Sequence, residues 1–396
     1  MDVINDQSGS RAAAAFERLY GYKAAGLWSA PGRVNLIGEH TDYNRGLCMP
    51  IAIPQRAWLA AARRDDAFLR LTSLDLDDTV EVALDVIGPG SPKGWSAYQA
   101  GVVWAMRGAG LAVGGIDSVL CSDVPVGSGL SSSAAVEGCL AVAASKLYGL
   151  GLADDDTGRA RLVTYCQQAE NQIVGAPTGG LDQTASLRSL NGHALLIDFG
   201  DLDDAGLPSA RPVPFDPGDD GLVLLVIDTN APHANNDGQY ASRRASCEAA
   251  VARLGITSLR DIGLDGLHDA LARLDDPAQI RAVRHVVTEN ARVLEAVDAA
   301  TARDWPRFGE LMNQAQDSQR DDYRISCPES DTACEVALDA GALGARQTGG
   351  GFGGSVIALI AAAGVQRLTE NLRHAYSANG WTAPGFFEAP ASAPAG

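Results

Sequence analysis

The stretch Arg33-Val-Asn-Leu-Ile-Gly-Glu-His-Thr-Asp42 places one cation, two carboxylates and one imidazole around a short apolar run. The alternating apolar side chains are typical of a strand, and Pro31-Gly32 before them is a turn signal. We therefore expect Glu39, His40 and Asp42 to lie at the end of a strand or just past it. Hydrogen-bond acceptors gathered there would suit the hydroxyl groups of a sugar. A solvated charged turn is the alternative interpretation.

The length and the charge of the chain exclude several classes of protein. At 396 residues the chain is too long for one small core, so we expect two domains. The 46% of hydrophobic and 20% of charged residues are typical of a globular protein. A net charge of −18 repels nucleic acid and anionic membranes, and we expect neither as a partner. Any phosphate group must be held locally, by backbone amides, a metal ion or single basic residues.

The seven cysteines are an odd number and form no Cys-x-x-Cys pair. This pattern argues against a disulfide framework and against a zinc site, and it favours the cytoplasm. The first ten residues hold two Asp and no basic segment before an apolar run, so we expect no secretory signal. The longest apolar stretches, 222–227 and 356–363, are too short to span a bilayer.

Helical and strand patterns mix without a fixed repeat, which indicates an α+β protein. An amphipathic helix is expected over 11–20, with Ser8 or Ser10 as its N-cap. A segment dense in Asp, Pro and Gly between Gly200 and Gly221 is the best candidate for a domain boundary. The Ala- and Pro-rich end of the chain is expected to be a loose tail. The other expected elements are strands at 116–121, 222–228 and 355–361 and helices at 131–148, 240–254, 279–299 and 305–316.

A second block, Pro125-Val-Gly-Ser-Gly-Leu-Ser-Ser-Ser133, lies between an expected strand and an expected long helix. Gly127 and Gly129 would let the backbone approach a ligand, and the free amides of the first helical turn would attract an anion. The hydroxyls of 131–133 could cap the helix, bond phosphate oxygens or bind Mg²⁺. The block lacks the Gly-Lys-Ser/Thr of a Walker A loop and the third glycine of a protein-kinase loop. A simple turn before a capped helix is the alternative.

A third block, Gly349-Gly-Gly-Phe-Gly-Gly354, precedes a strand-like run. A dinucleotide fingerprint requires a helix at that place, so we do not expect a dinucleotide site or an oxidoreductase. So many glycines indicate either a backbone packed tightly against another segment or phosphates, or a glycine-rich hairpin.

A fourth block joins Glu170, at the end of a helical stretch, to Asp182, which follows the loop Pro177-Thr-Gly-Gly. One carboxylate could hold Mg²⁺ while the other faces an acceptor hydroxyl. By itself, Asp182 fits a helix N-cap better than it fits a catalytic residue.

Taken together, the four blocks and Arg320-Asp-Asp-Tyr-x-x-Ser-Cys-Pro-Glu329 resemble the galactokinase family of GHMP small-molecule kinases, which also include homoserine and mevalonate kinases. The resemblance runs from about Ala14 to Phe387. It implies a two-domain fold with the active site in the cleft between a ribosomal S5 domain 2-like N-terminal domain and a ferredoxin-like C-terminal domain. We place these domains at 1–205 and 206–388, and the loose tail at 389–396.

By that resemblance, ATP phosphorylates the C1 hydroxyl of α-D-galactose with the help of Mg²⁺, which is the first committed step of galactose catabolism. Asp182 would be the catalytic base and Arg33 its cationic partner, stabilising charge on the transferring phosphoryl group. The remaining implied roles are the following: Glu39, His40, Thr41, Asp42, Gly179 and Tyr240 bind the sugar; Gly127, Ser128, Gly129, Leu130, Ser131, Ser132 and Ser133 cradle the ATP phosphates; Ser73 and Trp95 lie toward the adenosine; Ser133 and Glu170 hold Mg²⁺.

Two other functions stay open at this point, besides the oxidoreductase that the misplaced glycine fingerprint makes remote. A kinase for N-acetylgalactosamine or arabinose would share the ATP site and differ only around the sugar. A non-catalytic galactose sensor should have a damaged segment after the glycines, yet Ser131-Ser-Ser-Ala-Ala135 is intact.

The resemblance also implies a protein that is a monomer.

Overall fold

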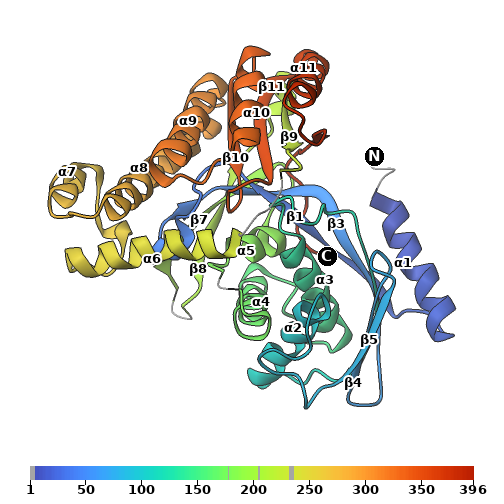
Figure 1. Cartoon of the computed structure of the whole chain (residues 1–396). Coiled ribbons are helices and arrows are strands. Elements are labelled where there is room, and N and C mark those ends of the chain that lie inside the picture. Colours follow the sequence, from blue (N-terminus) through green and yellow to red (C-terminus); the bar gives the residue numbers. More distant parts are fainter. Residues whose placement is uncertain (1–4, 177, 204–205, 232–235) are drawn as a thin grey trace.

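The structure, a computed structural model, describes residues 5–176, 178–203, 206–231 and 236–396. The molecule consists of two units of sheet and helix that meet along a central seam (Figure 1). This arrangement confirms the α+β fold class.

The first unit is built on a five-stranded sheet in the order β1-β3-β6-β4-β5, in which only β4 and β6 run parallel. Helix α1 packs on β3 and β6, while α3 and α5 pack on β1 and β3 from the other face (Figure 1). A small sheet in the order β2-β7-β8 adjoins this unit. The elements are α1 (Asn5–Tyr20), β1 (Gly26–Asn35), β2 (Leu47–Cys48), β3 (Pro50–Arg63), β4 (Phe68–Ser73), β5 (Asp78–Ala83), α2 (Ser96–Gly108), β6 (Ile116–Ser122), α3 (Ser132–Leu147), α4 (Asp156–Gln168), α5 (Leu181–Arg188), β7 (His193–Leu202) and β8 (Pro208–Pro214).

The second unit has an antiparallel four-stranded sheet in the order β10-β11-β9-β12. Its two central strands are almost continuously apolar, as expected for strands buried by helices. Helices α9 and α10 pack on β10, and α8 packs on α6 and α9. The elements are β9 (Leu222–Asp228), α6 (Asn236–Leu254), α7 (Leu264–Ala272), α8 (Pro277–Thr301), α9 (Trp305–Asp317), α10 (Pro328–Asp339), β10 (Gly344–Thr348), β11 (Ser355–Ala361), α11 (Val365–Ala378) and β12 (Gly385–Glu388).

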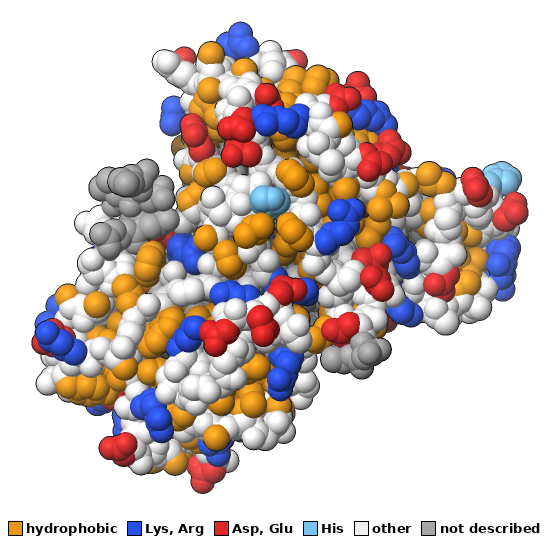
Figure 2. All heavy atoms as spheres, turned by 180° about the vertical axis from the view of Figure 1, so that it is seen from behind, with side chains coloured by type: hydrophobic (Ala, Val, Ile, Leu, Met, Phe, Trp, Pro, Cys, Tyr) orange, Lys and Arg blue, Asp and Glu red, His pale blue; other side chains and the backbone are white. Residues whose placement is uncertain are grey.

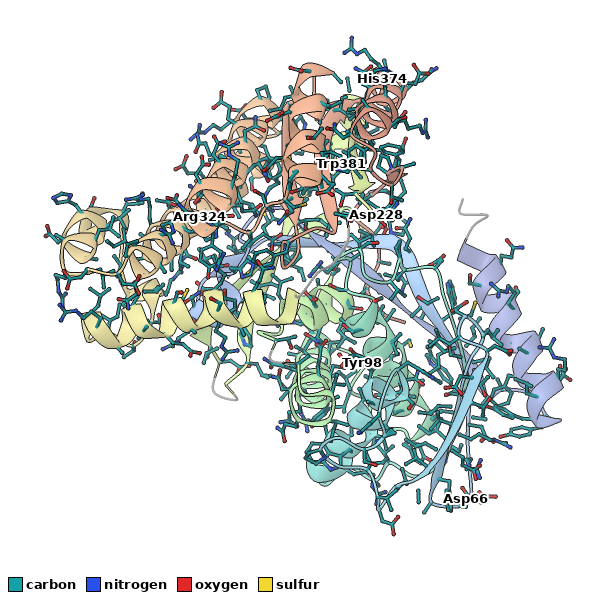
Figure 3. The ribbon with its side chains drawn as sticks, in the orientation of Figure 1. Asp66, Tyr98, Asp228, Arg324, His374 and Trp381 are labelled. Atoms are coloured by element: carbon teal, nitrogen blue, oxygen red, sulfur yellow. The ribbon has the colours of Figure 1, made fainter. Side chains whose placement is uncertain are left out.

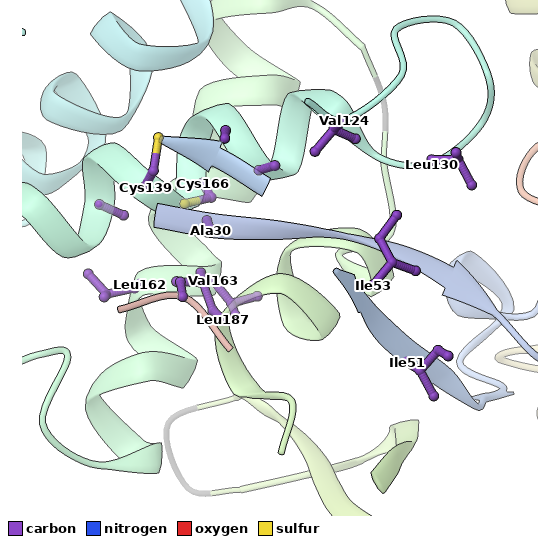
Figure 4. Packing of buried hydrophobic residues seen from close by; sticks show 14 of the residues in the cluster. Ala30, Ile51, Ile53, Val124, Leu130, Cys139, Leu162, Val163, Cys166 and Leu187 are labelled. Carbon is purple, nitrogen blue, oxygen red and sulfur yellow. The ribbon is translucent and has the colours of Figure 1, made fainter. Parts of the chain in front are cut away.

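One hydrophobic core connects the two units. Figure 4 shows part of it, where Ile53 of β3 lies near Val124 and Leu130 of the loop before α3. The same cluster contains Leu224 of β9 and further side chains of β11. A fully buried side chain of this size stabilises the fold by about 1.5–3 kcal/mol. The seam is therefore held by ordinary core packing as well as by polar contacts.

Most expected elements are confirmed, but their starts differ. Helix α1 already includes Asn5, so Ser8 and Ser10 lie inside the helix and do not cap it. Pro31 and Gly32 belong to β1, at a shift of register, rather than to a turn before it. At this bulge the backbone passes so close to Leu130 that only glycine fits. A Cβ atom at Gly32 would lie only 2.6 Å from the carbonyl oxygen of Leu130.

The proposed domain boundary stays a prediction. We place the boundary between residues 205 and 206, and residue 205 lies outside the described residues. Strand β8 pairs with β7, so the small sheet continues past 206, and the chain enters the second sheet only at Leu222.

The expected loose tail at 389–396 is wrong. The amide of Ala389 still donates to Leu224 of β9, and the chain then crosses to the first unit; Ala389, Ala391 and Ala395 are all buried. Ser29 and Gly396 exchange two backbone hydrogen bonds of 2.8 and 2.9 Å, and the amide of Ala395 donates to the Ser186 carbonyl at 2.9 Å. Composition missed this segment because its small residues resemble a linker, and backbone hydrogen bonds leave no trace in the pattern of residue types.

All seven cysteines are free thiols, as expected. Within the described ranges, no helix is long and apolar enough to cross a bilayer. Acidic and basic side chains are interspersed on the face shown in Figure 2, which has no continuous basic band.

We predict that Ala395→Glu lowers the thermal midpoint by several degrees, because a carboxylate in a buried site without a partner costs at least about 2 kcal/mol. Ala393→Glu is the matched control, since the side chain of Ala393 is exposed two residues away. Differential scanning fluorimetry of the two variants compares them directly. Equal midpoints would show that the tail is not packed as described.

Candidate active site

A cavity of about 650 Å³ opens at the seam between the two units. Both units contribute to its wall, and so do the four sequence blocks that lie far apart along the chain. The lining residues are Arg33, Glu39, His40, Asp42, Tyr98, Gly127, Gly129, Leu130, Ser131, Ser132, Ser133, Val174, Gly175, Ala176, Thr178, Gly179, Gly180, Leu181, Asp182, Tyr240, Ala241, Gly349 and Gly350.

An ion pair between Arg33 and Asp182 lies in the wall of the cavity. Arg33 extends from β1, and its Nε and Nη2 atoms lie 2.8 and 2.7 Å from Oδ1 of Asp182 in the first turn of α5. The hydroxyl of Ser131 donates to the other carboxylate oxygen at 2.6 Å. The N-cap of α5 is Gly180, so Asp182 does not cap its helix. The side chain of Asp182 remains 26% exposed, against 8% for Arg33, which leaves the carboxylate accessible from the cavity.

The glycine loop before α3 has the form of an anion site. Gly127, Gly129 and Ser131 have positive φ angles of 80°, 71° and 60°, which turn the chain sharply into the helix. Ser131 is the N-cap, and its side chain makes no capping bond to the backbone of α3. The first amides of α3 therefore lack a side-chain cap and carry the positive end of the helix dipole. This site can hold phosphate oxygens without any lysine.

Glu39 lies in the turn that follows β1, as expected. Its Oε2 accepts from Nδ2 of Asn35 at 2.8 Å, and Oε1 accepts from the amide of Gly349 at 2.8 Å. Burial raises the pKa of Glu39, while the charges of Arg346 and Arg33 oppose that rise. The carboxylate therefore links the turn after β1 to the third glycine block.

A buried ionic network supports this turn from the second unit. Oε1 of Glu289 accepts from the amide of Gly38 at 2.9 Å, and Oε2 accepts from Nε of Arg292 at 2.7 Å. Arg346 is fully buried, and its Nη1 donates to the Asn35 carbonyl at 3.1 Å. Although burial opposes it, the nearby cations lower the pKa of Glu289 to about 2. The network therefore holds the backbone of Gly38 in place. Only glycine fits there, because a Cβ atom would lie 2.4 Å from the Leu47 carbonyl oxygen.

His40 has a defined tautomer. Its Nε2 lies 3.1 Å from the carbonyl oxygen of Gly350, which can only accept, so Nε2 carries the proton. Nδ1 then accepts from the hydroxyl of Tyr43 at 2.8 Å. Burial lowers the pKa of His40 to about 3, so the ring is neutral. Both ring nitrogens are thus engaged, and a sugar hydroxyl would compete with one of these bonds.

Asp42 faces the segment that precedes Asp182. A Cβ atom on Gly179 would lie 2.1 Å from Oδ2 of Asp42, so only glycine allows this approach. Burial raises the pKa of Asp42 to about 6, and the negative charges of Asp182 and Glu39 add to the rise. Tyr240 of α6 closes this end of the cavity, 5.1 Å from the ring of His40.

Glu170 lies behind the loop that carries Asp182. Its Oε2 accepts from Nε2 of Gln183 at 2.5 Å and from the hydroxyl of Thr178 at 3.2 Å, and Ser133 also bonds to the carboxylate. Burial raises the pKa of Glu170 to about 7, and the charge of Asp182 adds to this effect. The structure thus brings Ser133 and Glu170 together, as the metal prediction requires.

Five predicted residues do not line the cavity. Thr41 is fully buried, with its hydroxyl 2.7 Å from the Leu47 carbonyl. Ser73 faces Asp78 across β4 and β5, and the Trp95 indole donates to the same Asp78 at 2.8 Å. Ser128 turns toward the second unit, and Glu170 lies behind the wall. Ligand contacts of these five residues stay predictions.

Sequence reasoning missed several residues of the site. Asn35 lies inside the quoted decapeptide, and Arg346 lies in a short strand whose sequence, Gly-Ala-Arg-Gln-Thr, contains no signal for a buried cation. Glu289 lies in the middle of a helix, and Tyr98 on α2 had no motif around it. Figure 3 labels Tyr98 on the side of the first unit that carries α3 and α4.

Comparison with known proteins matches this geometry. The chain matches the family models of the GHMP kinase N-terminal domain over 97–189 and the GHMP kinase C-terminal domain over 294–378. A mevalonate kinase structure superimposes with a TM-score of 0.65 at 16% identity, which supports the fold alone. The fold and the phosphate-binding loop define a small-molecule kinase of the GHMP family.

Relatives of higher sequence identity show to which family within the GHMP kinases the chain belongs. Residues 14–63 match the galactokinase galactose-binding signature. The chain is 50% identical to the galactokinase of Streptomyces coelicolor over 96% of its length and 95% of the relative, and 45% identical to that of Mycobacterium tuberculosis over 90% and 95%. A crystal structure of Lactococcus lactis galactokinase complexed with galactose has a TM-score of 0.88 at 30% identity, covering 97% of this chain and 98% of that one. The chain belongs to the galactokinase family.

We predict that Asp42→Asn has opposite effects on stability and on sugar affinity. Because the folded pKa of Asp42 lies above its ordinary 3.8, the stability linked to its protonated form is present below pH 3.8 and is lost as the pH rises through about 6. The variant should therefore melt at a higher temperature than wild type at pH 7.5, with little difference at pH 4. The KM for galactose should rise, because an amide replaces a full acceptor.

Glu289→Gln provides the control of opposite sign. Its folded pKa of about 2 lies below the ordinary 4.5, so its stabilisation is present above pH 4.5 and is lost as the pH falls toward 2. This variant should melt at a lower temperature at pH 7.5. An Asp42→Asn variant that is also destabilised at pH 7.5 would contradict the raised pKa of Asp42.

Proposed function

We propose that the protein transfers the γ-phosphoryl group of ATP to the C1 hydroxyl of α-D-galactose, giving galactose 1-phosphate and ADP. The observation that carries the proposal is the Arg33–Asp182 pair, which lies in one cavity between the carboxylates of the sugar turn and the glycine loop. A sugar hydroxyl and a phosphate group can thus approach the same carboxylate.

The sugar end of the cavity presents polar groups at fixed positions. We assign Glu39, His40 and Asp42 to galactose hydroxyls, with Gly179 leaving room beside Asp42 and Tyr240 closing the pocket. Asp42 is the group best placed for this role, because no other side chain hydrogen-bonds to its carboxylate within the described residues. Such a set favours a polyhydroxylated ligand over the carboxylated substrates of other GHMP kinases.

The phosphate end would hold ATP through backbone amides and hydroxyls of 127–133. Ser133 and Glu170 would hold Mg²⁺, since one carboxylate and one hydroxyl suit an ion that keeps most of its water ligands. The ion would neutralise charge on the ATP phosphates when bound.

In the proposed step, Asp182 accepts the proton of the C1 hydroxyl as the sugar oxygen attacks the γ-phosphorus. The bond from that phosphorus to the β–γ bridging oxygen breaks, and ADP leaves with the electron pair. Arg33 is always protonated and holds Asp182 by two N–H groups, so it orients the base and attracts the transferring phosphoryl oxygens. Catalysis rests mainly on position and charge.

The cell compartment and the assembly are also proposals. Seven free thiols fit a reducing compartment, so we place the protein in the cytoplasm. We expect a monomer, and size-exclusion chromatography with light scattering tests that expectation.

An ADP-release assay with a panel of acceptors tests the function. Galactose should be phosphorylated with the highest kcat/KM among galactose, N-acetylgalactosamine, arabinose, homoserine and mevalonate, and chelation of Mg²⁺ should abolish the rate. A preference for N-acetylgalactosamine or arabinose would favour the alternative sugar kinases. Binding of galactose without any turnover would instead indicate a sensor.

We predict that Asp182→Ala lowers kcat by at least about a hundredfold, because loss of a general base removes that much rate. Galactose binding should change little, because the sugar end of the cavity is held by other contacts. The thermal midpoint should fall by several degrees, because Arg33, which is only 8% exposed, loses its carboxylate partner. Asp182→Asn keeps the size of the side chain and should be nearly as inactive. Retention of more than about a tenth of the wild-type kcat would overturn the assignment of the base.

A further inference from the structure

Ser128 differs from its neighbours in the glycine loop. Gly127, Gly129 and Leu130 line the cavity, whereas Ser128 does not and is only 5% exposed. Its hydroxyl donates to Oδ2 of Asp228 in the second unit. The hydroxyl between the two loop glycines, Gly127 and Gly129, therefore already donates to a carboxylate of the protein.

Asp228 is well placed to act as a fixed acceptor. It is the last residue of β9, where its backbone is in register with Ser355 of β11 and Gly385 of β12. Its second carboxylate oxygen accepts from the amide of Asn230 at 3.1 Å. Figure 3 shows Asp228 near the place where the two units meet. The carboxylate is thus anchored to the sheet of the second unit.

Two further contacts join the same segments. The hydroxyl of Ser355 donates to the Ser128 carbonyl at 2.8 Å. A Cβ atom at Gly354 would lie 3.2 Å from the Ser128 carbonyl oxygen, and one at Gly349 would lie 3.0 Å from that of Gly129. The third glycine block therefore packs its backbone directly on the phosphate loop.

The first unit holds the loop from the opposite side. Nη1 of Arg33 donates to the Gly129 carbonyl at 2.5 Å, and the backbone amide of Arg33 donates to the Leu130 carbonyl at 3.1 Å. The position of the loop therefore depends on both units, and Asp228 supplies the charged contact from the second one. Hydrogen bonds to an ionised acceptor are about twice as strong as neutral ones.

We propose that Asp228 is a positioning residue, which holds Ser128 and so sets the phosphate loop for the nucleotide. Asp228 would act through Ser128 and would touch neither the sugar nor the reacting atoms. Loss of this contact should loosen the nucleotide end and leave the sugar end intact, because Glu39 and His40 are held by other contacts. The inference rests on the proposed use of ATP at this loop.

A double-mutant cycle on Asp228 and Ser128 tests the proposal. Asp228→Ala should raise the KM for ATP by about tenfold or more, in line with the loss of a hydrogen bond to a charged group. Galactose affinity, measured by calorimetry without nucleotide, should stay within about twofold, because a local contact at the other end of the cavity is lost. Ser128→Ala should have a similar effect, and the double variant should be little worse than either single one. Asp228→Asn can still bond Ser128 and should recover part of the loss.

Asp339→Ala is the matched control, since Asp339 is an exposed aspartate at the end of α10, far from the loop in sequence. Wild-type KM values in Asp228→Ala, additive effects in the double variant, or an equal loss of galactose affinity would each overturn the proposal. If Asp228→Ala melts much earlier than wild type, Ser128→Ala carries the test, because it removes only a hydroxyl. A wild-type protein without ATP-dependent turnover would contradict the proposed function rather than the role of Asp228.

Discussion

The ion pair between Arg33 and Asp182 is the interaction on which the site depends. It joins β1 to the first turn of α5, and Arg33 also bonds to the glycine loop while Ser131 bonds to Asp182. One guanidinium thus orients the proposed base and the proposed phosphate loop together. Breaking such a partly buried pair leaves a charge without its partner, which is far more costly than the net gain from forming the pair. The same contact therefore sets the positions of the proposed base and phosphate loop and the charge beside them.

Several acidic side chains lie in or beside the cavity, and neighbouring cations neutralise their negative charges to different extents. Glu289 is stabilised as an anion by two arginines, whereas burial and neighbouring charges raise the pKa of Asp42 and Glu170. The well-compensated carboxylate supports the turn, and the poorly compensated ones are those assigned to ligands. In the proposed function such groups would gain their full partners when a sugar or a metal ion binds, which is typical of functional sites that give up stability. Both units contribute to this arrangement, so neither unit alone contains the site.

Short motifs predicted the site residues that follow one another along the chain, and they failed where the contact depends on packing. Glu39, His40, Asp42 and the loop before α3 were recognisable because residue types and turn signals occur together. Asp228 and Glu289 had no such context, since a single carboxylate in a strand or helix has the same pattern whether or not it holds a loop. The C-terminal segment does not follow its composition: its small residues resemble a linker, yet backbone hydrogen bonds and burial of its alanines hold it in place. Local patterns therefore predict chemistry better than they predict the second layer of residues that supports it.

The most direct test of the central claim is a crystal structure of the protein with galactose and a non-hydrolysable ATP analogue. The claim predicts that the C1 hydroxyl of galactose lies within hydrogen-bond distance of the Asp182 carboxylate, with the γ-phosphate between Arg33 and the first amides of α3. A sugar bound with its C1 hydroxyl directed away from Asp182, or a γ-phosphate out of reach of Arg33, would contradict it.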